Sequence, residues 1–423
     1  MIRQLLLLTG VIAAAVNADT LTITQAVELG LQNNFSIRIA RNTTEKSFNN
    51  RKLKTGALLP TLRVDGNAAQ TNTHHYQPET AVFNSGSTPE LRGSATLNWT
   101  LFDGFKMFHA GHLIDQQSDL NTLAARHEIE VAAVTIMTAY YQLIAQRSLL
   151  DAARQQLDIS RAQLLFTEAQ FEFARVGKRE LLTQQVVVNT DSSQVLSRML
   201  DARSALHTLN IALGRTPDTP VSPAMDSSVN TPGHDASWWF YEAVQHNTGL
   251  KMATVRKHIA VTQHAIARAA LWPVLSAGGT LTATATQPVD NIRTRAELSL
   301  TFPLLTGFSR STGIRNAAID TQTADLTIQE MRLELQAHIY HQWEQLQISS
   351  EQVAFEQQTI DRAVQALELS DEQFKLGRIT DLQLREAQQS LLNARVRYQS
   401  ALFQNKVVAL QLQQLAGKLN IPL

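Results

Sequence analysis

Apolar residues recur every seven positions over much of this 423-residue chain. One series runs from Ile129 to Phe171 and another from Ile339 to Phe374, and each resumes after a glycine, from Leu181 to Leu209 and from Ala387 to Leu415. Sustained heptads specify helices that pack side by side with an apolar seam between them. The chain is therefore constrained to long coiled-coil helices, a mainly α fold.

The lengths of these helices restrict the fold further. A helix of about 71 residues over 106–176 would be roughly 105 Å long at 1.5 Å per residue. A second long helix is predicted over 309–376. Helices about half as long are predicted over 24–57, 178–213, 237–271 and 378–416. Two short helices stacked end to end match one long helix, so the six helices are expected to form the wall of a rod or tube. Helices as long as the two long ones are not used by ordinary globular domains.

The chain also repeats itself once. Asn34 aligns with Asn247 and Pro60 with Pro273 at an offset of 213. The segment 101–105 aligns with 304–308 at an offset of 203. Gly177 and Leu182 align with Gly377 and Leu382 at an offset of 200, and the shrinking offset indicates that the second copy has lost loop residues. We predict two copies of one structural unit, 19–214 and 236–423, joined by a Pro-rich linker over 215–235.

Between the short and the long helix of each copy the apolar period changes to two. Alternation is clear from Leu275 to Ala285 and from Ala296 to Phe302, with a turn over 287–291. The first copy alternates over 62–68 and 94–101, and the stretch 74–90 between them is expected to be an exposed loop. Segments of about ten residues with one apolar and one polar face are typical of membrane β-barrel strands. Ordinary half-buried hairpins are the alternative.

Aromatic residues at the ends of these strands fit the barrel interpretation, because aromatic girdles lie at membrane interfaces. They are Trp99, Phe102, Phe105, Trp272 and Phe308. Four strands cannot close a barrel, and an open sheet edge leaves backbone groups unsatisfied in lipid. We therefore expect several copies of the chain to associate, and three would supply twelve strands.

The N-terminus and the composition indicate the compartment. Residues 1–18 carry Arg3, an apolar stretch and small residues up to Ala18, the pattern of a secretory signal peptide. No later segment is apolar for long enough to form a membrane helix. The 37 basic and 37 acidic residues balance, which argues against a nucleic-acid partner. The absence of Cys excludes disulfides, thiolate metal sites and a lipid anchor on cysteine, and favours a Gram-negative envelope over eukaryotic secretion.

The sequence contains no recognisable catalytic pattern. It has no Gly-rich phosphate loop, nucleophile elbow or metalloprotease helix. The pairs His109/His112 and His338/His341 lack a third metal ligand and are expected to lie on solvated helix faces. We predict no enzyme activity, no cofactor and no metal site.

Taken in order, the duplicated motifs resemble those of the TolC-like outer-membrane efflux proteins. The resemblance rests on 21–26 with 32–34, on Pro60 and Pro273, on the corner 101–105, and on 374–382 followed by 386–389. It implies a homotrimer with a twelve-stranded barrel in outer-membrane lipid and a long periplasmic helical tunnel. It also implies two protein partners, a periplasmic adaptor (membrane fusion) protein and an inner-membrane RND or ABC transporter.

The resemblance places the functional residues at the periplasmic tip. Gly177, Leu182, Gly377 and Leu382 would form the helix-reversing turns and contact the adaptor. The acidic residues Glu180, Asp381 and Glu386 are candidates for a constriction, and Gln383 stands where better-known members of the family carry an acid. The alternative is that these acids are solvated helix charges paired with Arg378 or Arg385.

The predicted function is a passive trimeric exit duct for tripartite efflux or type I secretion, opened at its tip when the adaptor and pump dock. A soluble exported coiled-coil scaffold, with the strands as ordinary hairpins, is the alternative. Drugs, metals and proteins all remain compatible as cargo, because the inner-membrane pump selects it.

Overall fold

The computed structural model describes residues 20–79, 82–286 and 289–419. The predicted signal peptide over 1–18 therefore lies outside the described residues. Packing divides the described chain into two compact units. The first contains 20–40, 126–247 and 333–419, and the second contains 41–125 and 248–332. Each unit takes segments from both halves of the sequence, so the predicted sequence copies are interleaved in space.

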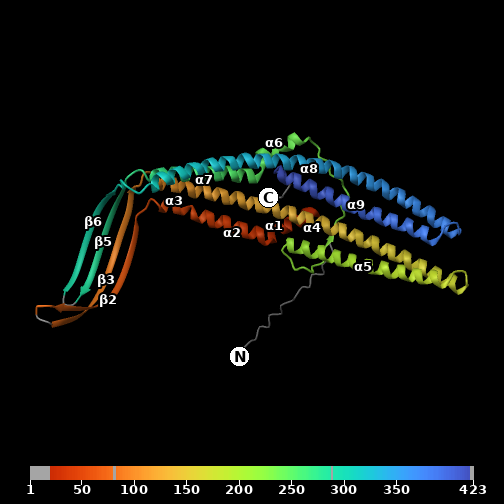
Figure 1. Ribbon diagram of the computed structural model, residues 1–423, viewed down its shortest axis with the longest axis horizontal. Coiled ribbons are helices and arrows are strands. Elements are labelled where there is room, and N and C mark those ends of the chain that lie inside the picture. The colour runs from red at the N-terminus through yellow and green to blue at the C-terminus, as the bar shows by residue number, and fades with distance from the viewer. Residues whose placement is uncertain (1–19, 80–81, 287–288, 420–423) are drawn as a thin grey trace, which may run out of the picture. The chain divides into compact units, whose positions relative to one another are not determined.

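Helices dominate the fold, as predicted (Figure 1). The long helices α4 (Lys106–Glu172) and α8 (Ser309–Lys375) have 67 residues each. The helices that follow them, α5 (Lys178–Ala212) and α9 (Asp381–Leu415), have 35 residues each. Both pairs are related by one offset of 203 positions, since Ser309 corresponds to Lys106 and Asp381 to Lys178.

The two predicted short helices before the strands are each interrupted. The first consists of α1 (Ile23–Asn33), α2 (Phe35–Asn50) and α3 (Lys52–Gly56), and the second of α6 (Ala236–His246) and α7 (Thr248–Ala269). Asn34 and Asn247 lie at corresponding breaks. The Asn34 side-chain amide donates to the carbonyl of Ala212 (2.8 Å), and that of Asn247 donates to the carbonyl of Leu415 (2.9 Å). Each asparagine thus satisfies a carbonyl at the end of α5 or α9, which the helix leaves unpaired.

A glycine completes each of these junctions. Gly214 and Gly417 follow α5 and α9 in left-handed conformations, with φ of 70° and 65°. A Cβ atom at Gly214 would lie 2.5 Å from the carbonyl oxygen of Asn33, and one at Gly417 would lie 2.8 Å from that of His246. Glycine is needed at both positions because of the backbone conformation and the close approach.

The core of the first unit is the heptad seam. Ile136, Leu143, Leu209, Ile339 and Val408 are completely buried. The predicted 3.5-residue period therefore corresponds to the packed face of these helices. Toward the α4–α5 turn the seam opens, and Phe171 is 39% exposed.

The Pro-rich segment 215–235 is fastened to this core. Within it β4 (Ser222–Pro223) pairs in parallel with β1 (Thr20–Leu21). The Tyr140 hydroxyl donates to the carbonyl of Leu21 (2.8 Å) beside this pair. The Lys406 ammonium, 4% exposed, lies 2.6 Å from the carboxylate of Asp226. Burial opposes the charge on Asp226, but the bonds from Lys406 and Ser228 lower its pKa to about 2.

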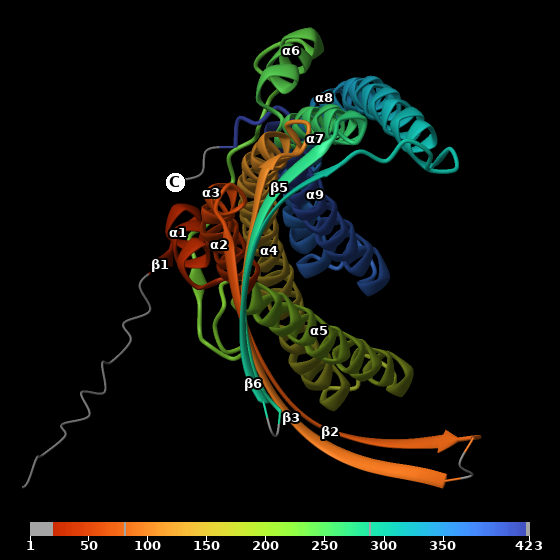
Figure 2. The same cartoon turned by 90° about the vertical axis from the view of Figure 1, so that its left-hand side faces the viewer.

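The second unit contains a four-stranded antiparallel sheet in the order β2-β3-β5-β6. Its strands are β2 (Thr61–Gln77), β3 (Val82–Phe102), β5 (Val274–Thr286) and β6 (Val289–Thr301). The hairpin β2–β3 continues past the other two strands (Figure 2). The pairing of β3 with β5 ends at Glu90 opposite Thr286, whereas its pairing with β2 goes on to Val82 opposite Gln77. Among the described residues, the outer edges of β2 and β6 have no partner strand.

The prediction of an exposed loop over 74–90 was wrong. Residues 74–77 belong to β2 and 82–90 to β3, with His74 opposite Ser85 and Thr71 opposite Thr88. The prediction failed because this stretch lacks apolar alternation. Its strands are held by the backbone hydrogen bonds between β2 and β3, which need no apolar face. The predicted turn over 287–291 is also too long, since β6 already begins at Val289.

Candidate functional site

The register of the sheet gathers its apolar side chains on one face. Leu62 lies opposite Leu97, Ala95 opposite Leu281, and Ala277 opposite Leu298, and directly paired residues point to the same side of a sheet. The side chains on this face are largely exposed, Val64 at 76% for example. A contiguous apolar surface of this kind marks contact with a membrane or a protein.

The opposite face is polar across all four strands. Arg63 pairs with Thr96, Thr96 with Thr280, and Thr280 with Arg295. Arg63 also forms an ion pair with Asp65 at 2.7 Å on the same strand. The sheet therefore separates an apolar from a polar environment, as a barrel wall does.

The predicted interface aromatics lie where the strands join the helices. Phe102 ends β3, and its ring meets that of Phe105 edge to face at 5.4 Å. The Trp99 indole N–H donates to the carbonyl of Leu58 (3.1 Å), and Trp272 follows α7. Phe105 and Phe308 both adopt left-handed conformations, with φ of 68° and 65°, and Phe308 is 85% exposed.

The two helix-reversing turns have the same geometry, which lies at the predicted Gly377 in the second copy but at Ala174 instead of Gly177 in the first. Ala174 (φ 58°) and Gly377 (φ 67°) are the left-handed residues. The following N–H groups, of Arg175 and Arg378, donate to the carbonyls of Gln170 and Gln373, both at 2.8 Å. Ala174 and Gly377 are related by the offset of 203 that also relates the helices.

The alignment of Gly177 with Gly377 was therefore wrong, and the offset between the copies shrinks from 213 to 203 but not further to 200. Gly177 has φ of −84° and caps the N-terminus of α5, and its counterpart is Thr380, which caps α9. Thr380 and Gln383 form a reciprocal capping box, so the side chain at position 383 serves the start of α9. Sequence comparison chose Gly177 because glycine is the usual left-handed residue.

The apolar tip candidates are accessible. Leu182 is 50% exposed and Leu382 is 67% exposed. Leu182 lies with Val186 and the side chain of Lys178 beside a shallow hollow on α5. Both leucines lie within the first turns after the chain reverses, so each is available to a partner.

The three acidic candidates have different environments. Glu180 is paired with Arg179 at 3.0 Å, and bonds from its own backbone N–H and from Arg179 lower its pKa. Asp381 is half-buried and accepts bonds from the side chains of Gln163 (2.8 Å) and Gln184 (2.7 Å), and burial raises its pKa. Glu386 is exposed. Within one chain these acids do not meet, and Asp381 instead connects α9 to α4 and α5.

A second polar contact between the same helices was not predicted. Arg385 forms a bidentate ion pair with Asp191, with both distances 2.9 Å, and also donates to the hydroxyl of Ser160 (3.0 Å). Burial opposes the charge on Asp191, but the bonds from Arg385 and Ser160 bring its pKa below the ordinary value. A signal was present, because Ser160, Gln184 and Asp191 each lie three positions after a seam residue, the place that alanine takes at 132, 139 and 153.

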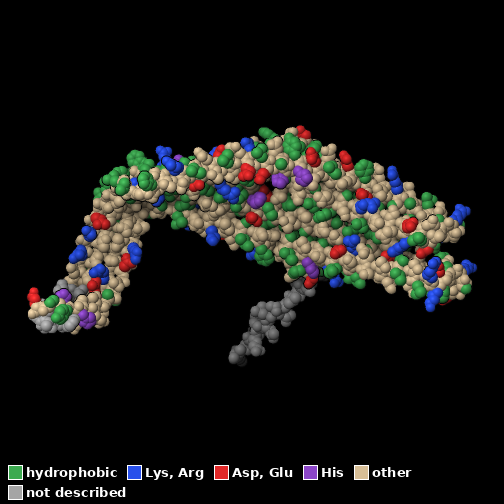
Figure 3. All heavy atoms as spheres, in the orientation of Figure 1, with side chains coloured by type: hydrophobic (Ala, Val, Ile, Leu, Met, Phe, Trp, Pro, Cys, Tyr) green, Lys and Arg blue, Asp and Glu red, His purple; other side chains and the backbone are tan. Residues whose placement is uncertain are grey.

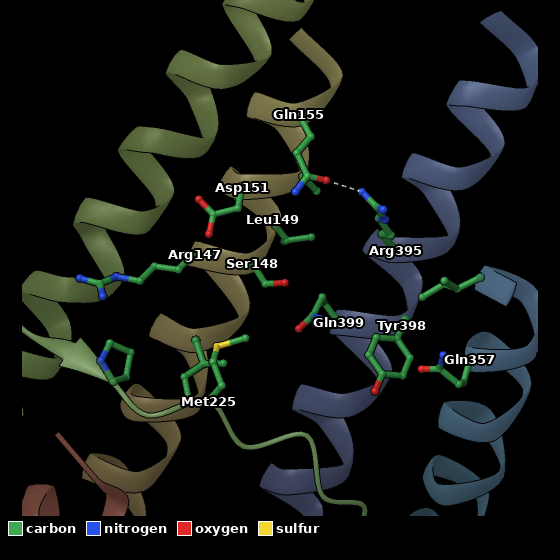
Figure 4. Close-up of a pocket in the computed structure, with 14 residues that line it drawn as sticks. Arg147, Ser148, Leu149, Asp151, Gln155, Met225, Gln357, Arg395, Tyr398 and Gln399 are labelled. Atoms are coloured by element: carbon green, nitrogen blue, oxygen red, sulfur yellow. Dashed lines mark hydrogen bonds between the residues drawn. The ribbon is translucent and has the colours of Figure 1, made fainter. Parts of the chain in front are cut away.

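A cavity of about 500 Å³ lies further along the helices of the first unit. Figure 4 shows Arg147 and Asp151 on α4 turned away from Arg395 on α9, which donates to Gln155 at 2.8 Å. The charged groups around this cavity therefore do not converge on one point. In the described ranges no group of three His, Asp or Glu residues could hold a metal ion. None of the described helices has both the length and the apolar character needed to cross a membrane.

Comparison with known proteins identifies the family. The model of the outer membrane efflux protein family matches residues 26–215 and 239–418, and the chain belongs to this family. Among curated proteins, none matches the chain. The protein is thus a member of an outer-membrane efflux channel family, located in the outer membrane with its long helices in the periplasm.

Solved structures with the same fold include three outer-membrane channels. The CmeC channel of Campylobacter jejuni has a TM-score of 0.79 at 14% identity, covering 94% of this chain and 85% of that one. VceC of Vibrio cholerae has a TM-score of 0.75 at 15% identity, with coverages of 93% and 96%. The open state of the MtrE channel of Neisseria gonorrhoeae has a TM-score of 0.74 at 16% identity, with coverages of 94% and 89%. These matches confirm the predicted fold, helices of the TolC-like type joined to barrel strands.

Proposed function

We propose that this protein is the outer-membrane exit duct of a tripartite efflux or type I secretion system and works as a homotrimer. The observation that supports this most strongly is the four-stranded sheet with two free edges, one apolar face and one polar face. Free edges are too costly in lipid to remain unpaired. Three copies joined edge to edge would make a twelve-stranded barrel whose polar face, with Arg63 and Arg295, lines the lumen.

The duct is proposed to be passive and without enzymatic activity. Cargo is chosen by an inner-membrane RND or ABC transporter, and a periplasmic adaptor contacts the tips. Support for the tip contact comes from the exposed Leu182 and Leu382 beside the two turns. Gly177 and Gly377 contribute by shaping those turns, the first as a helix cap and the second as the left-handed residue.

Opening is proposed to be a change in helix packing at the tip. The contacts of Asp381 with Gln163 and Gln184, and of Arg385 with Asp191, join α9 to the first hairpin in one chain. Of the three acids, Glu386 is the best candidate for a constricting ring, because it is exposed, whereas Asp381 is engaged within the chain and Glu180 is paired with Arg179.

Two adjacent residues test the barrel. Leu298 lies on the apolar face of β6 and Ser299 on the polar face. Leu298→Lys should cost about 2–4 kcal/mol if it lies near the bilayer midplane, whereas Ser299→Lys should be tolerated. The measurement is the amount of trimer in detergent-extracted outer membranes. Equal recovery of both variants, or recovery of the wild-type protein in the soluble periplasm, would favour the exported scaffold.

Conductance tests the constriction. In planar bilayers, Glu386→Gln should reduce the cation preference of the purified channel, because a ring of acids attracts cations. Glu180→Gln is the matched control, because the Glu180 carboxylate is already paired with Arg179. Unchanged ion selectivity of the Glu386→Gln variant would show that Glu386 does not form the constriction. The proposal that the protein is an exit duct would still stand.

A further inference from the structure

A hollow of about 760 Å³ lies in the second unit where β6 ends, α4 begins and α7 ends. Its walls carry four large apolar side chains and two polar ones. They are Phe105, Leu271, Trp272, Phe302, His109 and Arg268. Figure 3 shows apolar side chains gathered in this part of the molecule, with basic and histidine side chains among them.

The apolar walls are unusually open. Phe105 is 56% exposed, Leu271 53%, Trp272 57% and Phe302 50%. Each of these side chains leaves roughly half of its surface to the surroundings, although together they form a concave site. Aromatic groups with one apolar and one wet side are typical of membrane interfaces. The hollow is therefore shaped for an apolar chain rather than for water.

Arg268 gives the hollow a positive rim. It lies in the last turn of α7 and is exposed, and its guanidinium makes no hydrogen bond or ion pair with any residue that the structure describes. A guanidinium presents a planar fork of donors that matches the oxygens of a phosphate. The hollow thus combines an anion-binding group with an apolar wall.

The corresponding corner of the first copy is built differently. The offset of 213 places Thr55 where the second copy has Arg268. The neighbouring Lys54 is already paired with Asp115. Arg310, at the start of α8 after β6, donates to the carbonyl of Pro303 (2.8 Å). These two basic groups serve the chain itself, whereas the guanidinium of Arg268 is available to a ligand.

We propose that this hollow binds a glycerophospholipid of the periplasmic leaflet, with its phosphodiester on Arg268 and an acyl chain against Phe105, Trp272 and Phe302. The strands meet the periplasmic helices here, so the hollow lies at the height of the lipid headgroups. The proposal rests on the outer-membrane location that the family establishes. It also rests on the proposed trimeric barrel, because the sheet can lie in lipid only when its free edges are paired, but it does not depend on the adaptor or the gate.

Native mass spectrometry of the full-length protein in detergent, titrated with phosphatidylglycerol, tests the proposal. Arg268→Gln should bind the lipid about fivefold more weakly, the effect of one basic residue near a membrane surface. Arg268→Lys should recover part of the affinity. Arg256→Gln is the matched control, because Arg256 is exposed on the same helix but outside the hollow. Equal lipid affinity of wild-type, Arg268→Gln and Arg256→Gln protein would overturn the proposal.

Two further arms separate the lipid from simpler ligands. Phe302→Ser should also weaken phosphatidylglycerol binding, because the acyl chain loses an apolar contact. Inorganic phosphate at the same concentration should leave the bound lipid in place, because it lacks acyl chains. Displacement of the lipid by inorganic phosphate, or equal binding of a phosphate-free diacylglycerol, would contradict the proposed site. Circular dichroism establishes that each variant is folded before its affinity is compared.

Discussion

The two halves of the chain have long helices and following helices of identical length, but their strands differ in length. Their long helices have 67 residues each and the following helices 35 each. The strands differ, with 17 and 21 residues in the first half against 13 and 13 in the second. Helix length is fixed where helices pack along one another, because an insertion would shift every seam residue. Strand ends carry no such restriction.

One position inside the following helices also differs. Asp191 of α5 corresponds to Ala394 of α9 at the offset of 203, and both are buried. The second half fills this buried position with a methyl group, whereas the first half uses a carboxylate that binds Arg385. The two solutions suggest that the ion pair positions α9 more than it stabilises the fold.

Removing one partner of this pair should have the largest effect. Arg385→Met leaves the Asp191 carboxylate buried without its ion pair, which should cost about 3–5 kcal/mol of unfolding free energy. The double variant Asp191→Ala with Arg385→Met should recover most of that loss, because it reproduces the apolar solution of the second half. Denaturant unfolding in detergent measures both. A double variant no more stable than Arg385→Met would refute the comparison.

Substitution by alanine should destabilise the protein more at Gly214, after α5, than at Gly377, in the turn between α8 and α9. Gly214→Ala combines a left-handed conformation with a collision against Asn33 and should cost about 3 kcal/mol. Gly377→Ala has the same conformation but no atom within 4 Å of the added carbon, and should cost about 1 kcal/mol. Thermal unfolding of the two variants compares them directly. Equal losses would mean that the close approach at Gly214 relaxes freely.

Making the two turns alike should stabilise the first. Ala174 is held in a left-handed conformation that its counterpart Gly377 adopts without strain. Ala174→Gly should therefore raise the unfolding free energy by up to about 1 kcal/mol, because removing the Cβ penalty outweighs the extra freedom of the unfolded chain. Leu182→Ala is a suitable control for general changes at the turn. A destabilised Ala174→Gly variant would show that the turn tolerates the alanine at no cost.

The smallest expected effect is a pH dependence at Asp381. Burial raises the pKa of this carboxyl in the folded protein, so the folded state holds a proton that the unfolded state has lost. Its contribution to stability therefore falls as pH rises from the ordinary pKa of Asp through the raised one, by about 1 kcal/mol or less. Asp381→Asn should lack this dependence in unfolding measured between about pH 4 and pH 7. Parallel curves for the two proteins would exclude Asp381 as the source.

The sequence predicted those features that have a regular apolar period. Seam residues such as Ile136 and Val408 identified the packed helix faces because burial repeats with the heptad. The apolar strand faces with Leu62 and Leu298 were found for the same reason, with a period of two. The polar strand extension around His74 and Thr88 was missed because backbone pairing holds it without such a pattern.

Lateral contacts were beyond sequence reasoning. Asp191 and Arg385 are 194 positions apart, and a heptad pattern does not state which helices are neighbours or how they are shifted along each other. The left-handed Ala174 was missed for a different reason, because the turn that ends α4 requires a conformation that alanine disfavours. The connection of Asp381 to Gln163 and Gln184 depends on the same unpredictable register.

Phe105 and Phe308, where strands lead into α4 and α8, adopt a backbone conformation that lowers the stability of the chain. A bulky residue in a left-handed conformation costs about 1–2 kcal/mol, which glycine would avoid. Both copies nevertheless retain phenylalanine there, and more than half of each ring is exposed in the single chain. Packing of the exposed surface of these rings against lipid or a neighbouring copy, in the barrel proposed above, would offset this cost. The stability of both corners would then depend on the surroundings of the subunit as well as on its own contacts.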